Sequence, residues 1–101
     1  MKQFTAAELD QIIDSGETVI IDFFATWCGP CKMLAPIFES AAGKAEGRAV
    51  FAKVDTDQEP GLVARYGIQS VPTIIMIKNG ETAFRASGVM NEGALLALLD
   101  Q

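Results

Sequence analysis

Short, nearly continuous hydrophobic runs occur at three places in the chain and are typical of strands buried on both faces. They cover residues 18–24, 49–54 and 73–78. A fourth strand is predicted at residues 81–87, because Asn79-Gly80 separates it from the third run by the two residues of a tight hairpin. The first two runs are separated by residues 25–48, which is long enough for a helical crossover, so we expect these strands to pair in parallel.

Helical spacing of hydrophobic residues predicts four helices beside these strands. The first begins at Thr5, which forms a capping-box pattern with Glu8, and it ends at Gly16. The others are predicted at about residues 28–47, 60–66 and 91–99. Residues 2–4 add a possible short edge strand. The elements together predict an α/β fold with a mixed central sheet of four to five strands flanked by four helices.

The length and composition of the chain indicate how many domains it has and which kinds of partner are disfavoured. The chain has 101 residues without a linker or repeat, so we expect residues 1–101 to form a single domain. Its 8 basic and 13 acidic residues give a net charge of −5, which disfavours nucleic acid as a partner. No hydrophobic run reaches the length of a membrane helix, and none follows the N-terminus as in a signal peptide. We therefore expect a cytoplasmic monomer that does not bind membranes.

The chemistry of the chain centres on the motif Trp-Cys-Gly-Pro-Cys-Lys at residues 27–32. This motif lies where the first strand ends and the long helix begins, so Cys28 is near unpaired backbone N–H groups and the positive end of the helix dipole. Both favour the thiolate, which is the form that attacks disulfides. The spacing of Cys28 and Cys31 puts both sulfurs on one side of the first helical turn. We expect Cys31 to be the more buried of the two.

Two structural interpretations compete with a redox role for the cysteine pair. A static disulfide across so short an interval constrains little chain entropy, so it is a poor stabilising link. A zinc site needs four ligands, but the chain has two cysteines and no histidine, so zinc requires two chains. The redox interpretation is therefore preferred.

The chain resembles the thioredoxin family over essentially its whole length. Four separated signatures carry the resemblance: Asp22-Phe23, the motif at 27–32, Val71-Pro72-Thr73 and Lys78-Asn79-Gly80. The resemblance implies the thioredoxin fold and a protein-disulfide reductase that acts on disulfide-containing target proteins and is recharged by a thioredoxin reductase. The dithiol is itself the redox centre, so no bound cofactor and no metal is implied.

Thiol–disulfide exchange is the mechanism that the resemblance implies. Cys28 attacks the target disulfide, and Cys31 then resolves the mixed disulfide. A disulfide isomerase or oxidase is the main alternative; relatives of that kind typically carry histidine between the cysteines, whereas Gly29 and Pro30 stand here. A binding module with incidental thiols is a second alternative.

Two charged residues in otherwise hydrophobic strands are expected to tune the pair. Asp22 is the one ionisable residue in its run, and burial should raise the pKa of its carboxyl. A carboxyl of this kind can take the proton of Cys31, as the matching aspartate of the family is thought to do. Lys53 is placed near Asp22 by the resemblance, where its charge opposes that upward shift of the pKa.

A flat apolar patch for docking of targets is expected around the cysteines. Its members are Trp27, Gly29, Pro30, Val71, Pro72 and Gly88. By resemblance the peptide bond before Pro72 is cis, and the backbone of Val71 pairs with the target like a strand. Four residues depart from the common family pattern and put partner preference in doubt: Phe24, Thr56, Ser70 and Ser87.

Overall fold

A computed structural model describes residues 1–101. Its strands are β1 (Val19–Phe24), β2 (Val50–Asp55), β3 (Thr73–Lys78) and β4 (Glu81–Ser87). Its helices are α1 (Ala6–Asp14), α2 (Gly29–Lys44), α3 (Pro60–Tyr66) and α4 (Glu92–Ala97), followed by the 3-10 turn η1 (Leu98–Asp100). All the predicted helices and the four main strands are present. The capping box of Thr5 and Glu8 is also confirmed.

The strands form one mixed sheet in the order β2-β1-β3-β4. The pairing of β1 with β2 is parallel, as the crossover length predicts, and the other two pairings are antiparallel. Asn79 and Gly80 both have positive φ at the β3–β4 turn, which glycine and asparagine tolerate best. The possible fifth strand is absent, because Gln3 makes only an isolated bridge to Lys53 and no ladder continues from it.

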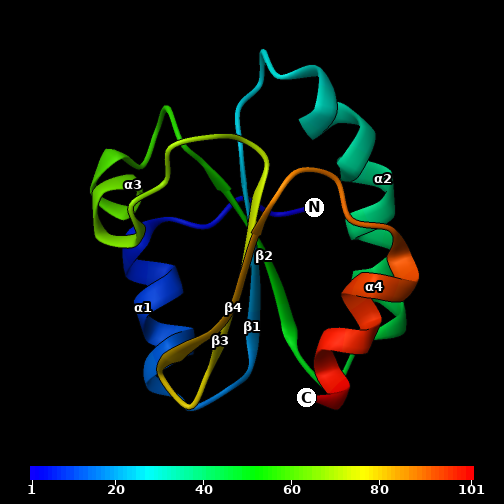
Figure 1. Cartoon of the computed structure of the whole chain (residues 1–101). Helices are drawn as coiled ribbons and strands as arrows, with labels where there is room; N and C mark the ends of the chain where they lie inside the picture. Colours follow the sequence, from blue (N-terminus) through cyan, green and yellow to red (C-terminus); the bar gives the residue numbers. More distant parts are fainter.

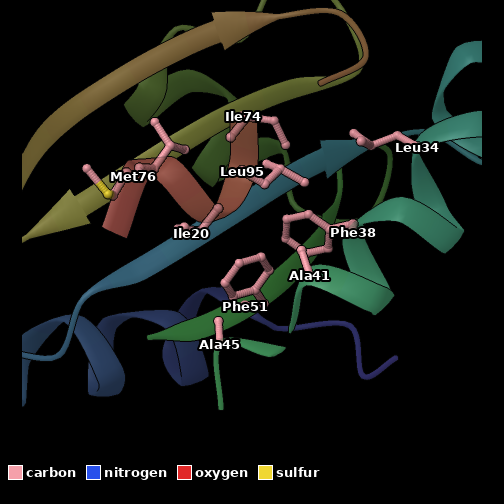
Figure 2. Close-up of a cluster of buried hydrophobic side chains, with 10 residues drawn as sticks. Ile20, Leu34, Phe38, Ala41, Ala45, Phe51, Ile74, Met76 and Leu95 are labelled. Atoms are coloured by element: carbon pink, nitrogen blue, oxygen red, sulfur yellow. The ribbon is translucent and has the colours of Figure 1, made fainter. Parts of the chain in front are cut away.

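Helices cover both faces of the sheet (Figure 1). On one face α2 and α4 enclose a cluster built around Ile20, Phe38 and Leu95, most of which Figure 2 shows as sticks. On the other face α1 and α3 enclose a second cluster that includes Leu9, Phe23 and Leu62. Each helix therefore buries one apolar stripe against the sheet, as amphipathic helices do in layered folds.

Side-chain alternation along β1 decides where its one charged residue points. Val19, Ile21 and Phe23 belong to the cluster under α1 and α3, whereas Ile20 belongs to the cluster under α2 and α4. Because successive strand residues face opposite sides, Asp22 lies on the α2 face. The strand thus directs a carboxyl toward the helix that carries the cysteines. None of the helices combines the length and the hydrophobicity needed to cross a membrane.

Candidate redox site

Cys28 and Cys31 form a disulfide at the amino end of α2. Their Cα atoms are 5.2 Å apart, within the range that a disulfide requires. Cys28 is the N-cap residue of α2, and Gly29 and Pro30 form the start of the helix. Proline fits there because the first helical N–H groups have no partner inside the helix. The predicted juxtaposition of the two sulfurs is therefore present.

The backbone of α2 favours negative charge on the sulfur of Cys28. The N–H of Cys31 donates a hydrogen bond to Cys28 Sγ over 3.2 Å. In the reduced protein this donor and the positive end of the helix dipole both stabilise a thiolate more than a thiol. Cys31 lies one turn further along the helix, away from its exposed end.

Both cysteines are almost fully enclosed. Cys28 is 5% exposed and Cys31 is 3% exposed, so the expected difference in burial between them is small. The backbone carbonyl oxygen of Val71 lies 3.7 Å from Cys28 Sγ. The peptide bond between Val71 and Pro72 is cis. The carbonyl of Val71 and the sulfur of Cys28 are therefore neighbours at the amino end of α2.

Asp22 is completely buried beneath this site, and neither of its carboxylate oxygens has a hydrogen-bond partner in the protein. Its burial raises the pKa of the carboxyl from 3.8 to about 6, against an opposing effect of the Lys53 charge. Lys53 is the register partner of Asp22 on β2, and its Nζ lies 4.0 Å from Asp22 Oδ2. The pair is thus placed by strand register rather than by a hydrogen bond.

The ammonium group of Lys53 also contacts the aromatic ring of Phe24. The Nζ atom lies 4.4 Å from the centre of the Phe24 ring, at a distance typical of a cation–π contact. A hollow of about 210 Å³ opens beside these two residues and is also lined by Cys31. Phe24, one of the four residues that depart from the common family pattern, is therefore in contact with Lys53.

The residues of the predicted docking patch differ in how far they are exposed to solvent. Trp27 is 71% exposed, and Gly29 and Pro30 are exposed beside it. Val71 and Gly88 are half-buried, whereas Pro72 is buried. Pro72 is therefore less exposed than the other members of the predicted patch, and its carbonyl accepts the N–H of Gly88 over 2.9 Å.

Comparison with known proteins agrees with this geometry. The family model described as Thioredoxin matches residues 1–101. The chain is 41% identical to a thioredoxin of Staphylococcus epidermidis over 97 residues, which is 96% of this chain and 92% of the relative. The chain belongs to the thioredoxin family.

Solved thioredoxin structures have the same fold. A chloroplastic thioredoxin z superimposes with a TM-score of 0.90 at 36% identity, covering 100% of this chain and 92% of that one. A Plasmodium falciparum thioredoxin gives 0.88 at 40% identity, covering 99% and 97%. Family membership and the bonded cysteine pair make this chain a thiol–disulfide oxidoreductase, and its geometry is consistent with a protein-disulfide reductase.

Three polar contacts near the cysteines have no counterpart in the sequence analysis. The indole N–H of Trp27 donates to Asp57 Oδ2 over 2.9 Å. Ser70 and Ser87, two of the departures from the thioredoxin pattern, are joined by a hydrogen bond between their hydroxyl oxygens. The buried hydroxyl of Thr73 also contacts Ser87. The partners come from segments far apart in the chain, so no local pattern indicates them.

Lys53 can be tested as a tuning residue. Replacing Lys53 by methionine removes the charge that lowers the pKa of Asp22 while keeping a long apolar side chain, so we expect this pKa to rise above about 6. The measurement is a carboxyl-carbon NMR titration of Asp22, with Lys2→Met as the matched control on an exposed lysine. An unchanged or lower pKa of Asp22 in the Lys53 variant would show that the lysine does not act on it.

Proposed function

We propose that Cys28 is the nucleophile and Cys31 the resolving residue in the reduction of protein disulfides. The observation that carries this assignment is the position of Cys28 as the N-cap of α2, with the Cys31 N–H directed at its sulfur. A thiolate is best stabilised at that position. Cys31 lies one turn further along α2, at bonding distance from Cys28, where it can attack a mixed disulfide formed on Cys28.

The proposed reaction transfers two electrons to the target. The Cys28 thiolate attacks one sulfur of the target disulfide, forming a mixed disulfide and releasing the other target sulfur as a thiolate. Cys31 then loses its proton and attacks Cys28 Sγ. The mixed disulfide breaks, the second target sulfur leaves as a thiolate, and Cys28 and Cys31 become bonded. The target is reduced and this chain is oxidised.

Asp22 is proposed as the base that takes the proton of Cys31. Its carboxyl is buried on the α2 face, and its pKa of about 6 lets it be ionised at neutral pH while remaining a better proton acceptor than an ordinary aspartate. Cys31 lines a hollow of about 210 Å³ that has room for water, and the hollow is also lined by Lys53, whose Nζ lies 4.0 Å from Asp22 Oδ2.

The proposed partners are disulfide-containing proteins and a thioredoxin reductase that returns the chain to its dithiol form. Val71 presents its backbone 3.7 Å from Cys28 Sγ, which supports strand-like pairing of a target segment beside the nucleophile. Gly29-Pro30 places no cation between the cysteines, which favours the disulfide form and hence electron donation. A reducing compartment such as the cytoplasm suits this direction.

Reduction of insulin with dithiothreitol as electron donor tests the function. We expect the chain to accelerate precipitation of the reduced insulin B chain well above the rate with dithiothreitol alone. Cys28→Ser serves as the matched variant and should lose this acceleration, because the nucleophile is absent. Equal rates with and without the wild-type chain would reject the proposed reductase activity.

A further inference from the structure

A hollow of about 450 Å³ opens beside the redox site. It is lined by Trp27, by Thr56 and Asp57 in the turn after β2, and by Gln69 and Ser70 in the loop before β3. Val71 lines the same hollow, and its carbonyl oxygen is 3.7 Å from Cys28 Sγ. A target segment attacked by Cys28 therefore has a neighbouring side chain within reach of this hollow.

The two donors at the outer wall of the hollow are already used inside the protein. The indole N–H of Trp27 donates to Asp57 Oδ2 over 2.9 Å. The hydroxyl of Thr56 donates to the carbonyl of Phe24 over 3.1 Å. An indole N–H and a hydroxyl each have one proton, so both groups have no further proton to offer a bound segment.

Three hydroxyl groups form a chain of hydrogen bonds that includes Ser70, which lines the hollow. Thr73 Oγ1 donates to the carbonyl of Ser70 over 2.7 Å, so its only proton is occupied. In the 3.2 Å contact between Thr73 and Ser87, Ser87 must then be the donor. Ser70 in turn donates to Ser87 Oγ over 3.2 Å. The Ser70 hydroxyl, which lines the hollow, is left with only its lone pairs.

The lining of the hollow is negatively charged as well as poor in free hydrogen-bond donors. The lining residues include Asp57 and no lysine or arginine. The ion pairs of the chain all involve other carboxylates. The backbone N–H of Asp57 donates to Asp55 Oδ1 over 2.9 Å, so this N–H is not free to pair with a bound segment either. Among the side chains, only the amide of Gln69 remains as a donor.

We infer that this hollow binds a basic side chain of the target, one or two residues from the cysteine that Cys28 attacks. An arginine or lysine supplies the donors and the positive charge that the hollow lacks, and its apolar stem packs on the three aliphatic side chains of the lining. The inference rests on the proposed function and names its substrate class, namely disulfides flanked by basic residues.

The test uses peptide disulfides that differ at one position beside the attacked cysteine. That position carries arginine, citrulline, alanine or glutamate, and citrulline keeps the shape of arginine without its charge. The measurement is the second-order rate constant for oxidation of the reduced chain by each peptide. We expect arginine to exceed alanine by about two- to fivefold, the range for a solvent-exposed ion pair, and glutamate to be slowest. The preference should fall between 0.01 M and 1 M salt, where the screening length shortens from about 30 Å to about 3 Å.

Asp57→Asn and Asp14→Asn form a matched pair of variants. Asparagine at 57 can still accept the Trp27 N–H but has no charge, so the arginine-to-alanine ratio should fall to about that of citrulline to alanine. Asp14→Asn removes the same charge at the last residue of α1, and Asp14 does not line the hollow. Its variant should keep the wild-type ratio. An equal fall in both variants would overturn the inference, because net charge and not the hollow would then set the preference.

Two further outcomes separate this inference from the proposed function. If the wild-type chain is oxidised at equal rates by all four peptides, the inference is wrong while the reductase activity stands. If none of the peptides oxidises the dithiol, the reductase proposal and the inference are both overturned.

Discussion

Cys31→Ser stops the reaction at the mixed disulfide and traps targets covalently on Cys28. The serine variant keeps the nucleophile at the N-cap of α2, so the first exchange still occurs. It has no second sulfur 3 residues away to displace the target. Well-placed intramolecular groups reach effective concentrations of about 10⁵ M or more, so we expect turnover to fall by at least about 10³-fold when only millimolar external thiol replaces Cys31.

The large expected loss of turnover can be compared with the smaller gain in rate that a lowered thiol pKa gives. Each unit by which a thiol's pKa falls toward neutral pH raises the thiolate fraction about tenfold but lowers its nucleophilicity about threefold, leaving a net gain of about threefold. Proximity of Cys31 therefore contributes more than activation of Cys28. The trapped species is measured by non-reducing electrophoresis and mass spectrometry, with the double variant Cys28→Ser, Cys31→Ser as control. Sustained wild-type turnover by the single variant would contradict the assignment of Cys31.

Asp22→Asn changes how the stability of the protein depends on pH. The pKa of Asp22 is about 6 in the folded protein and 3.8 without burial. Between these values the folded chain holds a proton that the unfolded chain has released, so the free energy of unfolding falls as pH rises from about 4 to about 6. A difference of about two pKa units lowers the free energy of unfolding by about 3 kcal/mol, and this loss persists above pH 6.

Asparagine does not titrate, so the variant should lack this loss. We expect its free energy of unfolding at pH 7, relative to that at pH 4, to exceed the corresponding wild-type difference by about 2–3 kcal/mol. Urea unfolding at several pH values measures the quantity, and Asp14→Asn at an exposed position is the control. The same slope in wild type and the Asp22 variant would mean that burial does not perturb this carboxyl.

The same variant tests the role of Asp22 as a base. In the wild type the resolving step should accelerate as pH rises through about 6, where the carboxyl becomes ionised. In Asp22→Asn this rise should be lost, and resolution at pH 7 should be slower by about 10²-fold, the lower end for general base catalysis. Rapid-quench analysis of the mixed disulfide measures the step directly. An identical pH profile in both proteins would remove Asp22 from the mechanism.

Local patterns were sufficient for the elements and the redox motif. The helix that begins after Cys28, the buried strand around Asp22 and the Asn79-Gly80 hairpin each depend on residues within a few positions of one another. Local patterns were not sufficient for the possible fifth strand, which is absent from the structure. Residues 2–4 are compatible with a strand, but only the tertiary structure shows that Gln3 bridges Lys53 and the ladder goes no further.

The order of residues alone predicts that Cys28 caps a helix that follows a buried strand, and that this strand contains one carboxyl group. It did not determine which polar groups surround the cysteine pair. The Trp27–Asp57 and Ser70–Ser87 contacts join residues 30 and 17 positions apart in the chain. Strand and helix formation is governed by neighbouring residues, whereas hydrogen-bond partners and burial are decided when separate segments pack together.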